Sequence, residues 1–140
     1  MTAGNRNTLV FCTLLLYGVT HFVGCQTHEK ETAVVRGTVS LDGQPVQKGV
    51  VMFVPRAGRS ARGVIRSDGT FQMSTYGEGD GAIVGENNVA VLVALGDDAT
   101  AEDIKKYSLP NKYASPASSG IVCDVKPGEE NEVNLKLESK

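Results

Sequence analysis

The side chains best suited to chemistry in this 140-residue chain are three cysteines and two histidines. Cysteine and histidine can together bind zinc or form a nucleophile–base pair. A zinc site needs three or four ligands, and a nucleophile needs a base held rigidly against it. Cys12 and His21 lie in an apolar N-terminal segment, and His28 lies in a polar stretch without periodicity. We therefore expect no metal site and no nucleophile–base pair.

Cys123 lies in a run predicted to be a strand, where it alternates with Ile121 and Val125. On a core-facing strand position, a free cysteine behaves as a small apolar residue. A reactive thiol would need exposed, electropositive surroundings. We expect Cys123 to be buried and unreactive, although it could pair with Cys25 if Cys25 is unmodified.

Carboxylates offer a second possible chemistry, because a pair of them can act as general acid and base. Four cluster between positions 97 and 103: Asp97, Asp98, Glu102 and Asp103. A charged first turn of a helix explains them more simply, since carboxylates stabilise a helix N-terminus. Thr100 followed by Asp103 is a variant of the capping box, so the sequence predicts one short helix over residues 99–107. No catalytic residue and no cofactor is predicted, and we do not expect an enzyme.

The glycine-rich segment 76–82 contains Glu78 and Asp80 but has neither the phosphate-binding nor the calcium-binding spacing. It is expected to be a loop between strands. The net charge of −2 gives no basic surface for nucleic acid. Three tyrosines in or near loops could stack on sugars, although loop packing is the simpler explanation. They are Tyr76, Tyr107 and Tyr113.

Residues 1–24 differ from the rest of the chain. Arg6 is the only charged residue before Cys25, and the apolar run Leu9–Val23 is shorter than the about 20 residues that span a bilayer. This pattern is typical of a secretory signal. The run ends in Phe22-Val23-Gly24-Cys25, which resembles a bacterial lipobox. The resemblance implies lipidation of Cys25; a plain signal peptide cut near Gly24 is the alternative.

Alternating apolar residues predict strands over most of the remaining chain. Val35–Leu41 is followed by the hairpin signal Asp42-Gly43, and further turn signals separate the other runs. The predicted later strands are residues 49–54, 61–66, 70–75, 89–95, 120–126 and 132–138. The expected organisation is a signal segment 1–24, a polar tether 25–32 and one β-sandwich domain 33–138.

Two stretches of this pattern resemble a known family. Residues 39–55, with Leu41-Asp42-Gly43 and Pro45, and residues 67–71 are similar to the carboxypeptidase regulatory-like, transthyretin-like domains. The segments around Pro110 and Pro127-Gly128 are similar to short planctomycete lipoproteins. The resemblance implies an all-β, seven-stranded, Ig-like Greek-key sandwich with one short helix, used as an accessory or binding module.

Together these observations predict a lipid-anchored cell-envelope protein with a structural or protein-binding sandwich. Gln26, rather than aspartate, follows Cys25, which by resemblance to sorting patterns favours the outer membrane. The expected partners are the membrane, through the anchor, and an envelope protein or glycan. A secreted or surface module that binds carbohydrate or peptide is the alternative. Lys136 and Glu138 are expected to protect an edge strand from pairing.

Overall fold

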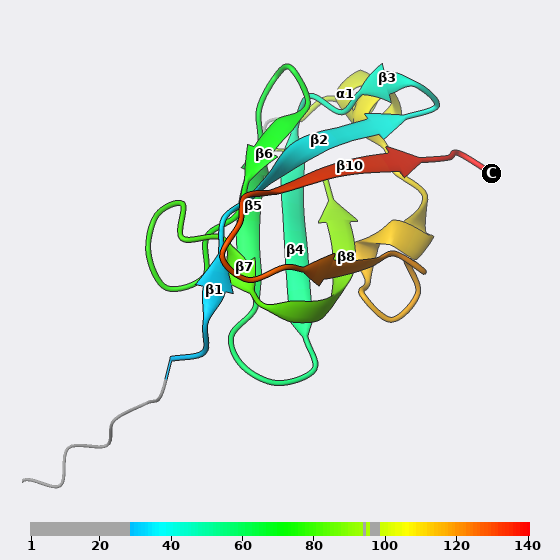
Figure 1. Cartoon of the computed structure of the whole chain (residues 1–140). Coiled ribbons are helices and arrows are strands. Elements are labelled where there is room, and N and C mark those ends of the chain that lie inside the picture. The colour runs from blue at the N-terminus through cyan, green and yellow to red at the C-terminus, as the bar shows by residue number, and fades with distance from the viewer. Residues whose placement is uncertain (1–28, 94, 96–98) are drawn as a thin grey trace, which may run out of the picture.

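A computed structural model describes residues 29–93, 95 and 99–140 of the chain. Two four-stranded sheets pack face to face and enclose one apolar core, and a two-stranded sheet lies at one end (Figure 1). The predicted fold class, an all-β sandwich, is confirmed. Among the described residues, no helix combines the length and apolar character that crossing a bilayer would require.

The first sheet is built around β2 (Val35–Leu41), the strand predicted with these same bounds. On one side, β10 (Asn131–Leu137) runs parallel to β2 along its full length. On the other side, β3 (Gln44–Pro45) and β6 (Thr70–Gln72) pair with β2 in antiparallel orientation.

The second sheet is antiparallel throughout. Its strands, in spatial order, are β5 (Ala61–Ile65), β4 (Gly49–Pro55), β8 (Gly85–Leu92) and β9 (Val122–Val125). The small sheet pairs β1 (Thr32–Ala33) with β7 (Ala82–Ile83). Arg62 and Ser74 exchange two backbone hydrogen bonds beside β5, which joins the two large sheets at one corner.

The core forms where the predicted alternation places apolar side chains between the sheets. Val35 and Val39 of β2 are buried while Arg36 and Thr38 are exposed. Phe53 and the predicted inward residues Phe71 and Met73 are also fully buried. The largest fully buried side chains therefore come from both sheets, as the two-residue period of half-buried strands requires. They are Phe53, Phe71, Met73, Leu137, Val35, Val39, Val51, Val89, Val91, Val125 and Asn87.

The strand count and some bounds differ from the prediction. The seven predicted strands correspond to β2, β4, β5, β6, β8, β9 and β10, and three two-residue strands are added: β1, β3 and β7. Strand β8 begins at Gly85 and ends at Leu92, although the alternation predicts 89–95. Its pairing with β4 ends at Leu92 because β4 itself begins at Gly49. Thr32, assigned by the sequence to the tether, lies in β1.

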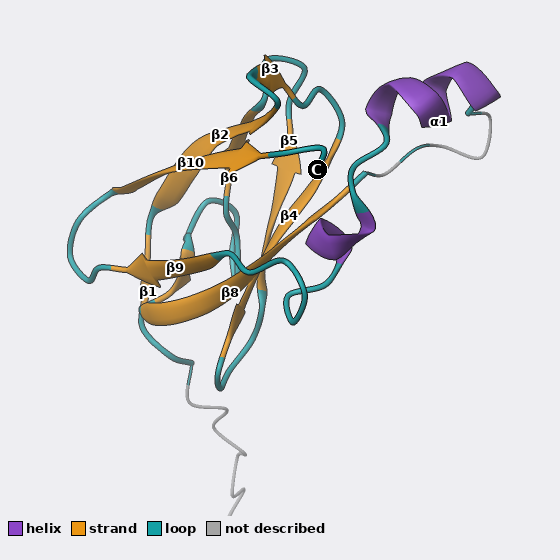
Figure 2. Ribbon diagram, turned by 90° about the vertical axis from the view of Figure 1, so that its right-hand side faces the viewer, coloured by secondary structure: helices purple, strands orange, loops and turns teal. Residues whose placement is uncertain are grey.

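The predicted helix is present as α1 (Ala101–Tyr107), with the expected cap. The Thr100 side chain accepts a hydrogen bond from the Asp103 N–H, and the Asp103 carboxylate accepts one from the Thr100 N–H. The segment predicted as a long loop contains a short 3-10 helix, η1 (Asn111–Ala114), which packs against β8. Helix α1 has no buried residue, and Figure 2 shows it standing clear of both sheets.

The sandwich has two ends with different contents (Figure 1). The proximal end carries β1, where the described chain begins, and the loop from Pro55 to Ala61. The distal end carries the turn between β2 and β3, helix α1 and the C-terminus. Strand β2 runs from Val35 at the proximal end to Leu41 at the distal end, so the two ends of the sandwich are separated by the length of this strand.

Gly37, in the middle of β2, should be essential to the packing of the first sheet. A Cβ atom at this position would lie 1.8 Å from the Val133 carbonyl oxygen and 2.9 Å from the ring of Phe71. We expect Gly37→Ala to lower the free energy of unfolding by about 1–3 kcal/mol, measured by urea denaturation. Gly77→Ala is the control, because nothing lies within 4 Å of its Cβ position. Equal stability of the two variants would contradict this prediction.

Candidate functional site

The candidate site is a groove at the distal end, between the β2–β3 hairpin and the C-terminal end of α1. It encloses about 300 Å³. Its lining is mainly apolar, with two glutamines and one lysine: Leu41, Gln44, Pro45, Val46, Gln47, Lys106, Tyr107 and Leu109. We call it the distal groove. Such a composition, apolar with a few polar groups, is common in ligand-binding clefts.

One wall of the distal groove is the β2–β3 hairpin. Asp42 and Gly43 have φ angles of 48° and 82°, the two positive values that a type I′ turn requires. The turn folds β3 back on β2, and the N–H of Val46 donates to the carbonyl of Val39 at 3.0 Å. Val46 is consequently buried, while Pro45 stays exposed at the rim.

The other wall is the end of α1 and the residues that follow it. Tyr107 is the last residue of the helix and is half-buried, and its hydroxyl donates to Gln47 Oε1 at 3.4 Å. The Nζ atoms of Lys48 and Lys106 lie 5.7 and 5.1 Å from the centroid of the Tyr107 ring. At these distances each ammonium group is attracted to the ring by a cation–π interaction. The groove therefore combines an apolar floor with Lys106 in its lining and Lys48 beside the Tyr107 ring.

Asp103 is the carboxylate that lies near these two lysines. Hydrogen bonds from the Thr100 hydroxyl and N–H, and then the charges of Lys48 and Lys106, lower the pKa of Asp103. Its Oδ2 atom accepts both Thr100 bonds. The capping role thus fixes this carboxylate at the first turn of α1 rather than in the groove.

The structure does not bring the three predicted tyrosines together. The Tyr76 hydroxyl accepts a hydrogen bond from the Lys30 N–H at 3.0 Å, near the proximal end. Tyr113 is buried, and its hydroxyl accepts from the Glu138 N–H at 3.0 Å and donates to the Glu138 carbonyl at 3.4 Å. Tyr107 alone of the three lines the distal groove.

The two cysteines singled out in the sequence have different outcomes. Cys25 lies outside the described residues. Cys123 is half-buried on the inner side of β9, and Val122 and Asp124 on either side are exposed. Burial, and then the Asp124 charge, raise the pKa of the thiol. A protonated thiol is a poor nucleophile. Cys123 is less buried than the sequence predicts, because β9 lies at the edge of the second sheet.

Asp80 organises the glycine-rich loop. Its carboxylate accepts hydrogen bonds from the N–H groups of Thr75, Tyr76 and Gly77 at 2.7, 2.8 and 2.9 Å. Burial on its own raises the pKa of Asp80, but these donors outweigh it and the pKa lies below its usual value. The carboxylate closes the loop.

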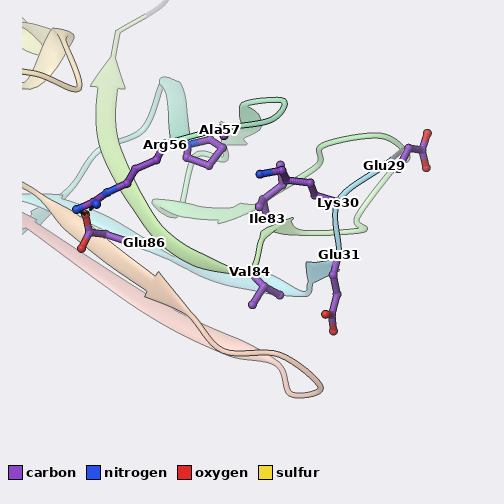
Figure 3. Close-up of a pocket in the computed structure, with 9 residues that line it drawn as sticks. Glu29, Lys30, Glu31, Arg56, Ala57, Ile83, Val84 and Glu86 are labelled. Atoms are coloured by element: carbon purple, nitrogen blue, oxygen red, sulfur yellow. Dashed lines mark hydrogen bonds and ion pairs between the residues drawn. The ribbon is translucent and has the colours of Figure 1, made fainter. Parts of the chain in front are cut away.

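A second groove lies at the proximal end, with a volume of about 500 Å³. Figure 3 shows Arg56 meeting Glu86 at one side, where their ion pair measures 2.9 Å, and Glu29 and Glu31 pointing away on the other. Its charges nearly balance, and its apolar lining residues are Pro55, Ala57, Ile83 and Val84. This groove lies where residues 29–31 pack against the sandwich.

The acidic residues with lowered pKa values all accept hydrogen bonds that hold a turn, a helix cap or the segment after β10. Asp42 accepts a hydrogen bond from the Ser139 N–H, and Asp68 accepts from the N–H and hydroxyl of Thr70. Asp97 and Asp98 lie outside the described residues. Within the described part of the chain, no group of three or more histidine, cysteine or acidic residues could hold a metal ion.

Comparison with known proteins yields no match: no family model, no curated protein and no solved structure is significantly similar to this chain. Any function must be argued from the site itself. Sequence reasoning singled out Tyr107 but missed its neighbours Gln47, Lys106 and Leu109. The sequence predicts the hairpin and the capped helix that carry or adjoin these residues. No pattern in the neighbouring sequence indicates that the hairpin and the helix meet.

Removing the Asp80 charge should destabilise the loop in a pH-dependent way. Asp80→Asn weakens three charge-assisted hydrogen bonds and should cost about 1–2 kcal/mol at pH 7. Because the folded-state pKa is lowered, this stabilisation is complete above the unfolded pKa of about 4 and is lost as the pH falls through the folded pKa. Urea denaturation at a series of pH values should therefore show the two proteins converging in acid. The exposed neighbour Glu78→Gln serves as the control, and a pH-independent difference would refute the prediction.

Tyr113 and Tyr107 should differ in their contributions to stability. Tyr113→Phe removes a buried hydroxyl that holds the end of β10, which should cost about 1 kcal/mol. Tyr107→Phe removes one long, exposed hydrogen bond and should change stability by less than about 0.5 kcal/mol. Thermal or urea denaturation of both variants tests this. A larger loss of stability in Tyr107→Phe than in Tyr113→Phe would contradict the prediction.

Proposed function

We propose that this is a lipid-anchored protein of the cell envelope whose β-sandwich is a non-catalytic, protein-binding module. The observation that carries the proposal is the apolar run ending in Val23-Gly24-Cys25. Lipidation at Cys25 would attach the chain to a membrane, with the outer membrane favoured by Gln26. We further propose that the domain belongs to the transthyretin-like, carboxypeptidase regulatory-like class, because its seven longer strands follow the pattern that the resemblance implies.

The attachment of the entering chain supports an anchor close to the domain. Lys30 is bonded to Tyr76, and the Glu31 carbonyl accepts from the Val84 N–H at 3.0 Å before β1 begins. Glu29 is only four positions after Cys25. Four residues span at most about 14 Å, so a lipid at Cys25 would hold the proximal end near the membrane surface.

The position of the distal groove supports a binding role in this arrangement. Strand β2 has seven residues and is about 20 Å long. An anchor at the proximal end would therefore turn the distal groove away from the lipid. A groove in that position is accessible to other proteins of the envelope.

The use of the acidic residues supports a non-catalytic role. General acid–base catalysis needs a carboxyl group whose pKa lies near the working pH. Asp68, Asp80 and Asp103 have lowered pKa values because each accepts hydrogen bonds within its own turn or cap, and Asp42 because it accepts one from Ser139. Such groups stay ionised at neutral pH and serve the fold.

A secreted module that binds carbohydrate or peptide is the second candidate, favoured by the half-buried Tyr107 in the distal groove. The two candidates differ in what happens at Cys25. An anchored protein carries lipid there, whereas a secreted one has a free thiol or a disulfide.

The deciding experiment is the intact mass of the protein from a bacterial membrane fraction, compared with a Cys25→Ala variant. We expect a chain that begins at Cys25 and carries a diacyl or triacyl group, and we expect both features to be lost in the variant. A cleaved chain without lipid, recovered from the soluble fraction, would reject the anchor and favour the secreted module.

A further inference from the structure

We propose that the distal groove binds a short acidic peptide segment of a partner protein, in which an apolar side chain lies next to a carboxylate. The inference rests on the proposed protein-binding function and specifies the ligand. Three features of the groove carry it: an apolar floor, two amides at the rim and two nearby lysines that form no ion pair with a described acidic residue.

The apolar floor of the distal groove would bind the apolar side chain of the peptide. Leu41 and Leu109 are half-buried against the core cluster, and Val46 is a buried member of that cluster. The volume of about 300 Å³ is at the small end for a ligand cleft. It suits one or two side chains of a peptide rather than a large cofactor.

The rim offers hydrogen bonds for a peptide backbone. Gln44 and Gln47 are exposed, and a glutamine amide can donate to a carbonyl and accept from an N–H. Gln47 Oε1 already accepts from Tyr107, which leaves the Gln47 NH₂ group to donate. The two glutamines come from β3 and the residues after it, so the hairpin holds both at one edge of the groove.

The charge of the rim selects an acidic ligand. Lys48 and Lys106 form no ion pair with a described acidic residue, and both Nζ atoms lie over the Tyr107 ring. Asp103 is close enough for both lysines to lower its pKa, but neither lysine forms an ion pair with it. A peptide carboxylate would provide the lysines with a direct partner.

The exposed apolar surface of α1 points to a macromolecule rather than a small ion. Ile104 is 55% exposed and precedes Tyr107 by three residues, so both lie on one side of the helix. Because α1 buries no residue in the domain, its apolar side is available to a partner. Two ammonium groups lie over the Tyr107 ring, and a sugar that stacked on the ring would compete with them for its faces.

The test uses the purified full chain in detergent and an array of hexapeptides in which leucine, isoleucine or phenylalanine alternates with glutamate or aspartate. Matched arrays carry lysine or glutamine in place of the acid. We expect binding to the acidic array only, with affinities then measured by fluorescence anisotropy. Raising the salt concentration from about 0.05 to about 0.5 M should weaken the binding.

Charge reversal assigns the binding to the groove. The double variant Lys48→Glu/Lys106→Glu changes two exposed side chains and should weaken binding by at least about tenfold, while the melting temperature checks the fold. Lys30 is an exposed lysine at the proximal end, so the Lys30→Glu variant should bind the acidic peptides as the wild type does. Equal binding to the three arrays, unchanged affinity in the double variant, or preferential binding to a glycan array would each overturn the proposal. Lipidation at Cys25 is tested separately, by the intact mass of the protein. A failure of the proposed lipid anchor can therefore be distinguished from a failure of the proposed peptide binding.

Discussion

The parallel pairing of β2 with β10 is the contact on which the rest of this structure depends. All seven residues of β2 face residues of β10, and Gly37 allows the Val133 backbone to approach closely. The contact continues beyond the strands, because the Asp42 N–H donates to the Leu137 carbonyl at 3.0 Å and its carboxylate holds Ser139. The hairpin that forms one wall of the distal groove is therefore fixed in place by the last residues of the chain.

Local features of this fold could be predicted from the sequence. The alternation of Val35–Leu41, the turn at Asp42-Gly43 and the capping box of Thr100 with Asp103 all depend on residues within a few positions of each other. The pairing of β1 with β7 and the extension of β8 back to Gly85 depend on distant partners. No pattern in Thr32–Ala33, or in the polar start of β8, distinguishes these residues from a tether or a loop.

The sequence predicts the hairpin and the helix that form the distal groove, but it does not predict that they meet. Tyr107 is conspicuous as an aromatic residue next to a loop, whereas Leu41 and Val46 read only as strand residues. They become a binding surface because the helix end returns to the hairpin, some 60 positions away along the chain, as the Tyr107–Gln47 contact records. The proximal end, by contrast, is occupied by contacts between the entering chain and the sandwich. The two ends of one small domain are thus suited to different tasks.

The pairing of β2 with β10 also determines when the domain can form during synthesis. Val35 faces Asn131, 96 positions later, so β2 has an uncovered edge until the last part of the chain is available. Contacts between such distant residues make folding slow, and an uncovered strand edge invites pairing with other chains. A chain that lacks residues 131–137 cannot close its first sheet. Residues 131–137 therefore protect the edge of β2 from pairing with another chain.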